Sequence, residues 1–177
     1  SPTGPLDIYG LTKLTGERLC RGFNADTGIR TTAVRFFNAF GPKETNPHLI
    51  PEIHRQIVQG TRVLKLGNTT PKRDFIHTTD MARAIRLLID RPGPSYDVFN
   101  LGSGVEYSVT DVVDAFSATL AEPLRIEVDP ARVRKVERMH LVADTTKLRS
   151  TCTWRPEVDL AAGIRELARD TRTYDQH

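Results

Sequence analysis

Tyr9 and Lys13 are the residues whose types and spacing most directly suggest catalysis. Residues four apart lie on one face of a helix, so a helix here directs the phenol and the ammonium into one site. A nearby cation stabilises a phenolate and lowers the tyrosine pKa from its usual value of about 10 toward neutrality. Asp7 can cap this helix and place Tyr9 in the first turn, where the helix dipole favours negative charge. The pair therefore suggests a base and its activator, although many helices carry such a pair on a solvated face by chance.

The elements that must position this pair follow an alternating pattern. Apolar spacing predicts helices over residues 8–24, 51–59, 78–89, 109–120 and 160–173. Runs of β-branched and aromatic residues predict strands over residues 31–37, 63–66, 73–77, 98–101 and 126–128. We expect residues 38–42 to break the first strand. Helices that alternate with strands in this way indicate an α/β fold with parallel strands.

The ends of several helices are marked by capping residues. Gly28 is placed to end the first helix, and Thr78 or Thr79 is placed to cap the third. Ser108 and Asp111 have the spacing of a capping box, which predicts the start of the fourth helix. These signals act within a few residues, so they predict helix ends independently of the rest of the fold.

The composition limits the classes of partner. The chain has 177 residues, enough for one domain with a substantial core. Its 25 Lys and Arg residues are nearly balanced by 22 Asp and Glu residues, and the basic residues are not interleaved with stacking aromatic residues. An anionic small molecule accounts for the net charge of +3. We therefore expect no nucleic-acid partner.

The cysteines and the apolar runs indicate the cellular compartment of the protein and whether it has a membrane partner. Cys20 and Cys152 lie far apart and match no metal-ligand spacing, so we expect reduced thiols and no metal site. No apolar run approaches the roughly 20 residues that span a bilayer. The sequence thus predicts a cytoplasmic protein with no membrane partner.

Four segments in order carry a family signature. They are residues 9–13 with Glu17, residues 35–42, residues 72–77, and residues 100–104 with Ser108. Together they resemble the extended short-chain dehydrogenase/reductase family, and within it the NAD-dependent nucleotide-sugar epimerases and dehydratases. The resemblance covers essentially the whole chain and corresponds to the carboxyl-terminal half of such an enzyme.

The resemblance implies a fold and a domain organisation. It implies the carboxyl-terminal part of a Rossmann-like parallel sheet plus a smaller mixed α/β substrate-binding region, as one partial unit over residues 1–177. The family's amino-terminal half holds the dinucleotide on a Gly-rich turn, G-x-G-x-x-G or G-x-x-G-x-x-G, which this sequence lacks. We therefore expect that the NAD-binding half is absent, that the chain is a fragment or has lost this half, and that the isolated piece is inactive.

Catalytic and cofactor roles also follow from the resemblance. Tyr9 would take a proton from a sugar hydroxyl while hydride passes to NAD, and Lys13 would bind the nicotinamide ribose. Phe36 and Phe37 would form part of the cofactor wall. The choice between NAD and NADP stays open, because the residues that distinguish the two cofactors belong to the absent half.

The resemblance further implies a set of substrate-binding residues: Asn38, Leu49, Ile50, Arg73, Arg134 and Glu137. Arg73 would bind the diphosphate, with Asp74 orienting it, and Arg134 would be a second phosphate ligand near a ribose-binding Glu137. Simple turn chemistry for Asn38, a surface ion pair for Arg73 and a solvated basic loop over residues 132–138 are the alternatives.

The implied reaction is a UDP-sugar 4-epimerisation through a transient 4-keto intermediate. A nucleotide-sugar 4,6-dehydratase and a uronic acid decarboxylase of the same family are alternatives. A non-catalytic nucleotide-sugar-binding or assembly module is the alternative from another class. The expected partners are a nucleotide-diphosphate sugar and either a second copy, in a homodimer that pairs the Tyr9 helices, or the missing half.

Overall fold

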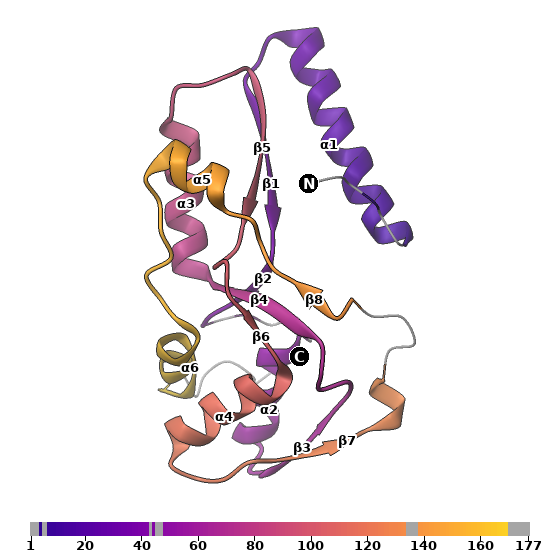
Figure 1. Ribbon diagram of the computed structural model, residues 1–177, viewed down its shortest axis with the longest axis vertical. Coiled ribbons are helices and arrows are strands. Elements are labelled where there is room, and N and C mark those ends of the chain that lie inside the picture. The colour runs from indigo at the N-terminus through magenta and orange to yellow at the C-terminus, as the bar shows by residue number, and fades with distance from the viewer. Residues whose placement is uncertain (1–3, 5–6, 43, 45–47, 134–137, 170–177) are drawn as a thin grey trace.

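The chain folds into an elongated molecule whose two ends carry different layers (Figure 1). The computed structural model describes residues 4, 7–42, 44, 48–133 and 138–169. We call the end built on strands β1 and β5 the upper part and the end built on α2, α4, β3 and β7 the lower part, as they stand in Figure 1. Strands β2 and β4 join the two parts.

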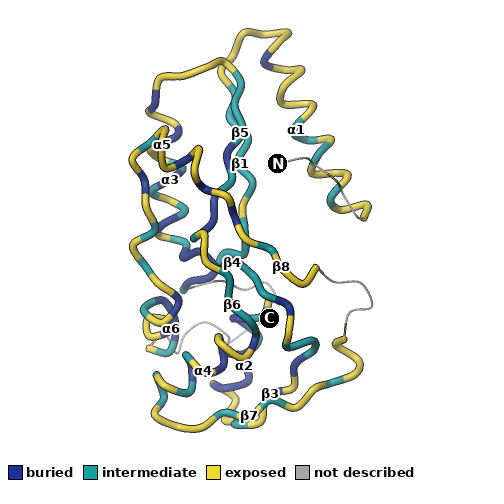
Figure 2. The backbone as a smooth tube through the Cα atoms, in the orientation of Figure 1, coloured by how far each residue is buried: buried dark blue, intermediate teal, exposed yellow. Residues whose placement is uncertain are grey.

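The first helix, α1 (Ile8–Thr27), has the predicted ends. The Asp7 carboxylate accepts a hydrogen bond of 2.7 Å from the Gly10 N–H, which confirms the cap. Gly28 ends the helix in the left-handed region, with φ 71°, and donates to the Asn24 carbonyl, as predicted. Asn24 is the one buried residue of the helix, and Figure 2 shows α1 as mostly exposed. The apolar side chains of α1 therefore find little cover within this chain.

The upper part is a pair of parallel strands between helices. Strand β1 (Thr31–Phe36) pairs with β5 (Tyr96–Leu101) in parallel. Helix α1 lies on one side of this pair, and α3 (Thr78–Asp90) and α5 (Thr146–Cys152) lie on the other (Figure 1). The buried hydrophobic residues that form this core are Ile76, Ala84, Leu88, Phe99, Leu101, Leu148 and Trp154.

The middle of the molecule contains a strand that the sequence did not predict. Residues 38–42 were expected only to break the first strand, but β2 (Asn38–Phe40) pairs in parallel with β4 (Lys72–His77). The Phe37 N–H closes the β1–β5 pairing on the Leu101 carbonyl, and the chain then passes to a new partner strand. Strand β4 also pairs with β6 (Glu106–Tyr107), antiparallel, and with β8 (His140–Leu141), parallel.

The lower part packs three helices and two strands around a second core. The helices are α2 (Leu49–Val58), α4 (Val109–Leu120) and α6 (Leu160–Arg169). Strand β3 (Val63–Leu66) pairs in parallel with β7 (Arg125–Val128), and the short helix η1 (Pro130–Arg132) follows. Its most deeply buried hydrophobic side chains include Phe40, Ile50, Ile53, Leu64, Val112, Phe116 and Ile164.

The helix caps confirm one prediction and correct another. Ser108 and Asp111 form the predicted capping box of α4, with both reciprocal hydrogen bonds present. The cap of α3 is His77 and not a threonine, because the buried His77 ring accepts a hydrogen bond from the Thr79 N–H.

Elements β6, β8 and α5 were not predicted. Together with the parallel pairs, the arrangement confirms the expected α/β fold class.

Two further observations concern the cysteines and membranes. Cys20 and Cys152 are both free thiols. Within the described ranges, no helix combines the length and apolar character needed to cross a bilayer.

Candidate functional site

A pocket of about 340 Å³ opens in the lower part of the molecule. It collects four predicted substrate residues from three elements: Asn38 of β2, Leu49 and Ile50 of α2, and Arg73 of β4. The size suits a small ligand. The other two predicted residues, Arg134 and Glu137, lie outside the described residues.

The parallel pairing of β2 and β4 positions two of these side chains. Asn38 begins β2 opposite Phe75, and its amide nitrogen donates to the Asp74 carbonyl at 3.2 Å. The Arg73 guanidinium donates to the carbonyls of Lys72 and Arg138, at 2.8 and 2.7 Å. Backbone acceptors therefore fix both polar groups at the pocket wall.

Asp74 has a different role from the predicted one. Its fully buried carboxylate accepts from the N–H groups of Ser103, Gly104 and Ala143, at 2.7, 2.9 and 3.0 Å, and from the Ser103 hydroxyl at 2.6 Å. These hydrogen bonds tie β4 to the loops that follow β5 and β8. The prediction that Asp74 orients Arg73 is therefore wrong, because its carboxylate is turned to these loops.

The pocket also contains an ion pair that sequence reasoning did not assign to the site. Glu52 of α2 and Arg132 of η1 both line it, with Arg132 Nη1 2.8 Å from Glu52 Oε1. Burial raises the pKa of Glu52, but hydrogen bonds from Arg55, Arg132 and Gln56 outweigh it and lower the pKa to about 2. The basic run over 132–138 was a signal for Arg132, whereas only tertiary contact reveals Glu52.

The Tyr9 and Lys13 side chains lie together on α1, as their spacing predicts. The Lys13 ammonium lies 5.0 Å from the centroid of the Tyr9 ring, and the Tyr9 side chain is exposed. Neither residue lines the pocket. The structure therefore gathers the predicted residues into two groups, a Tyr–Lys pair on α1 and a polar pocket in the lower part.

An ion pair between α1 and β1 shows toward which end of β1 the Tyr9–Lys13 pair lies. The Arg35 guanidinium donates two hydrogen bonds of 2.7 Å to the Glu17 carboxylate, and hydrogen bonding to Arg35 is the main reason that the pKa of Glu17 is lowered. Figure 1 shows that α1 and β1 run in opposite directions. Tyr9 lies eight residues before Glu17, about 12 Å along the helix, toward the carboxyl end of β1. Parallel-sheet proteins bind ligands at that end of their strands.

Phe36 and Phe37 lie at the same end of β1. Phe36 is 52% exposed, whereas Phe37 is partly buried. Phe36 therefore offers an exposed aromatic ring, which is the kind of group that packs against a planar cofactor ring.

A sequence profile of the NAD dependent epimerase/dehydratase family matches residues 1–102. The chain belongs to this family. The resemblance inferred from the four segments is therefore confirmed.

Known members of the NAD dependent epimerase/dehydratase family match almost the whole chain. The GDP-6-deoxy-D-mannose reductase of Pseudomonas aeruginosa is 29% identical over 171 residues, which cover 94% of this chain and 56% of that protein. A UDP-glucose 4-epimerase of Corynebacterium glutamicum is 32% identical over 172 residues, which cover 88% of this chain and 51% of that protein. The chain thus spans about half the length of the curated relatives it matches.

Solved structures of the family share the fold. RMD from Pseudomonas aeruginosa complexed with NADPH superposes with a TM-score of 0.86 at 24% identity, over 95% of this chain and 57% of that one. MoeE5 in complex with UDP-glucuronic acid and NAD superposes with a TM-score of 0.83 at 28% identity, over 94% of this chain and 56% of that one. These matches confirm the Rossmann-like α/β fold.

Proposed function

We propose that this chain is the substrate-binding and catalytic part of an NAD-dependent nucleotide-sugar epimerase that acts at C4 of a UDP-sugar. The observation that carries the proposal is the pocket, which brings Asn38, Leu49, Ile50 and Arg73 together from separate segments. A nucleotide-sugar needs such a combination of apolar wall and directed polar groups.

Each pocket residue has a role that suits its chemistry. The planar guanidinium of Arg73 binds the diphosphate, because its fork of N–H donors matches phosphate oxygens. Leu49 and Ile50, in the first turn of α2, form an apolar wall for the nucleoside. Asn38 offers an amide to the sugar or its phosphate. The pocket thereby holds the ligand by its nucleotide and leaves the sugar to the catalytic pair.

Tyr9 and Lys13 carry the proton chemistry in this proposal. Tyr9, as the phenolate, removes the proton of the sugar C4 hydroxyl, the C4=O bond forms, and the C4 hydrogen leaves with its bonding electron pair as hydride. When bound, NAD supplies the hydride acceptor. Lys13 stabilises the phenolate and binds the nicotinamide ribose. Return of hydride to the opposite face of the 4-keto sugar, with return of the proton from Tyr9, gives the epimer.

The proposal includes the domain organisation. The 177 residues act as one partial unit, and a Gly-rich half outside them holds the pyrophosphate of the dinucleotide. The exposed apolar residues of α1, Leu11, Leu19 and Phe23, support association of this helix with that half or with a second copy.

A second candidate is a reductase that acts on a 4-keto GDP-sugar. The match to the GDP-6-deoxy-D-mannose reductase, over 94% of the chain, favours it. The same groups serve this reaction, because Tyr9 as the phenol donates a proton to the ketone oxygen while C4 receives hydride. NADPH would then be the hydride source.

The test uses the protein as its own gene produces it, with its intact mass recorded. We expect interconversion of UDP-glucose and UDP-galactose in the presence of NAD. Tyr9→Phe should lower kcat by about 10² to 10⁴ and leave UDP affinity unchanged. Product analysis separates epimer, reduced, dehydrated and decarboxylated sugars. UDP-sugar binding without turnover, and without any effect of Tyr9→Phe, would favour the non-catalytic binding module.

A further inference from the structure

The first turns of α1, which carry the Tyr–Lys pair, are held differently from the later turns. The later turns are tied directly to β1 and to the loop before β5. The Glu17 carboxylate accepts from Arg35 at 2.7 Å, and the Asn24 amide donates to the Ser95 carbonyl at 3.0 Å. In the described part of the chain, no hydrogen bond or ion pair joins residues 7–16 to another element. The position of the catalytic pair therefore depends on what holds the segment before α1.

Arg138 holds that segment. Its side chain, just before β8, donates from Nη2 to the Gly4 carbonyl at 3.1 Å, across 134 positions of the chain. Gly4 lies three positions before the Asp7 cap and five before Tyr9. Because α1 begins within a few residues of Gly4, this hydrogen bond limits how far the start of the helix moves relative to β8.

The backbone of Arg138 is fixed by the strand that carries Arg73. The Arg73 guanidinium donates to the Arg138 carbonyl at 2.7 Å. Next to it, the Lys72 N–H donates to the Met139 carbonyl, also at 2.7 Å, where β4 and β8 begin to pair. Arg73 lines the pocket, whereas Arg138 does not. Arg138 therefore connects a pocket residue, through its carbonyl, to the segment before the catalytic helix, through its side chain.

This connection affects the geometry that proton transfer needs. A general base must lie within about 2.6–3.2 Å of the oxygen whose proton it takes. Tyr9 and Arg73 lie on different elements, so the distance from a nucleotide at Arg73 to the Tyr9 phenol depends on how α1 is held relative to β4. A displacement of about 1 Å at the reacting groups lowers a rate by up to about 10²-fold.

We propose that Arg138 is a positioning residue that links the pocket to the catalytic helix and keeps Tyr9 at the sugar of a ligand bound at Arg73. The inference rests on the proposed function, which assigns the nucleotide to Arg73 and the proton transfer to Tyr9. In this role Arg138 touches neither the ligand nor Tyr9, and it acts through two backbone carbonyl groups, its own and that of Gly4. A ligand that orders Arg73 should therefore also order the start of α1.

The first experiment measures hydrogen exchange of the intact protein by mass spectrometry, with and without UDP. Arg138→Met removes the donors, so without UDP it should speed exchange over residues 8–14 by about 3- to 10-fold. UDP should slow this exchange in wild type but not in Arg138→Met. UDP affinity, from calorimetric titration, should stay unchanged, because Arg73 binds a backbone carbonyl that both proteins have.

The second experiment measures turnover of the UDP-sugar with NAD. Arg138→Met should lower kcat by about 5- to 10-fold and leave KM close to wild type, since the substrate binds as before. Arg138→Lys keeps a charged donor and should recover part of kcat and part of the protection over residues 8–14.

Arg149→Met is the matched control for both experiments. Arg149 also donates to a backbone carbonyl, that of Ser103 at 3.4 Å, and it lies in α5, outside the pocket. This variant should behave like wild type in exchange, in UDP affinity and in turnover.

Three results with Arg138→Met would overturn the inference. The first is exchange over residues 8–14 that equals that of wild type, whatever the activity. The second is faster exchange with an unchanged kcat, which would leave Arg138 a purely structural contact. The third is a loss of UDP affinity as large as the loss of kcat, which would make Arg138 a ligand-binding residue.

The same data separate this inference from the proposed function. Protection of residues 8–14 by UDP that is lost in Arg138→Met, in a protein without turnover, would support the link and contradict the enzyme. Turnover that Tyr9→Phe lowers and Arg138→Met leaves unchanged would support the enzyme and overturn the link. No effect of UDP on this exchange in wild type would overturn the link as well.

Discussion

Two carboxylates, Asp97 and Glu52, each hold two cations, yet they lie at opposite ends of the molecule. Asp97 is near the start of β5 in the upper part, and Glu52 is in α2 beside the pocket. Ion-pair chemistry is nearly the same at both places. The difference between them lies in what the cations contact apart from the carboxylate.

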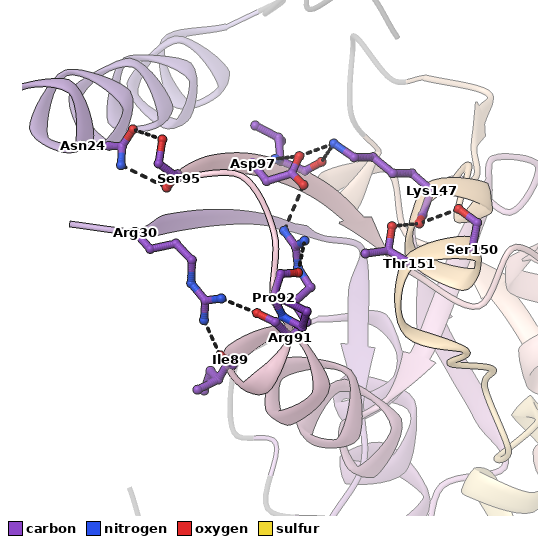
Figure 3. Close-up of polar contacts among 11 residues, drawn as sticks. Asn24, Arg30, Ile89, Arg91, Pro92, Ser95, Asp97, Lys147, Ser150 and Thr151 are labelled. Atoms are coloured by element: carbon purple, nitrogen blue, oxygen red, sulfur yellow. Dashed lines mark hydrogen bonds and ion pairs between the residues drawn. The ribbon is translucent and has the colours of Figure 1, made fainter. Parts of the chain in front are cut away.

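At Asp97, whose contacts Figure 3 shows, one cation, Arg91, is buried by the protein, whereas the other, Lys147, is 56% exposed at the surface. Arg91 donates to Asp97 at 2.9 Å, with both side chains about nine-tenths buried, and Lys147 pairs with the other oxygen. Both cations also lie over the Phe99 ring, 4.6 and 4.7 Å from its centroid. Arg30 adds hydrogen bonds to the carbonyl of Ile89, in the last turn of α3, and to that of Arg91, which follows the helix. None of these residues lines the pocket, so this network stabilises the fold.

At Glu52 one cation faces a cavity. Arg132 is 42% exposed there and keeps N–H donors that no described residue accepts. The comparison teaches that an ion pair indicates a binding site only when a cation retains unused donors beside a concave surface. Charge by itself does not distinguish the two regions.

Removal of Asp97 should have the largest effect on stability. Asp97→Ala leaves Arg91 buried without its carboxylate, which should lower the free energy of unfolding by about 3–5 kcal/mol. UDP affinity of the folded protein should not change. Urea unfolding followed by circular dichroism, with calorimetric titration, measures both. A loss of UDP affinity without a loss of stability would reverse the distinction between the two regions.

Asp74→Asn should affect both properties, because Asp74 belongs to the strand that joins the two parts. The new amide NH₂ would face backbone N–H donors, which should cost about 2–3 kcal/mol of unfolding free energy. Arg73 precedes this residue, so UDP affinity should fall as well. Chemical denaturation and titration of the same preparation measure both. Wild-type affinity in the variant would show that the pocket does not depend on these loop contacts.

Acid should weaken the Glu52 ion pair over a defined pH range. The pKa of Glu52 is about 2 in the folded chain, against about 4.3 when unfolded. A lowered folded pKa gives a stabilisation that is present above about pH 5 and is lost as pH falls from about 4 toward 2. The thermal midpoint of wild type should therefore approach that of Glu52→Gln over this range. Midpoints that stay equally far apart down to pH 2 would contradict the ion pair.

The smallest effect is expected at Arg62. Its pair with Glu122 is exposed on both sides, and such pairs contribute about 0–1 kcal/mol. Arg62→Met should leave both UDP affinity and the unfolding midpoint close to wild type. A clear loss of affinity would mean that overall positive charge, and not the position of Arg73, attracts the ligand.

Local signals predicted much of the fold. The Asp7 cap, the Gly28 helix end and the Ser108–Asp111 capping box are all present, because each depends on residues within four positions. The first strand ends at Phe36, before residues 38–42, as expected, but the strand that these residues begin was missed for the opposite reason. Strand β2 exists only because β4, more than thirty residues later, supplies its hydrogen-bond partners.

The site was predicted in part. The family resemblance named Asn38, Leu49, Ile50 and Arg73, and one pocket contains them all. Their roles in binding stay predictions, as do those of Tyr9 and Lys13. Glu52 was missed because its sequence neighbours carry no motif, and its ion pair with Arg132 joins residues eighty positions apart.

The sequence by itself determined the family, the α/β class, and the placement of Tyr9 and Lys13 on one helix face, since these follow from motifs and short-range periodicity. Only the tertiary structure decided that Asp74 binds loops and not Arg73, and that Glu52 holds Arg132 at the pocket. The physical reason is that the partners of a carboxylate are chosen by which donors the folded chain brings within about 3 Å, and spacing along the chain carries no information about that.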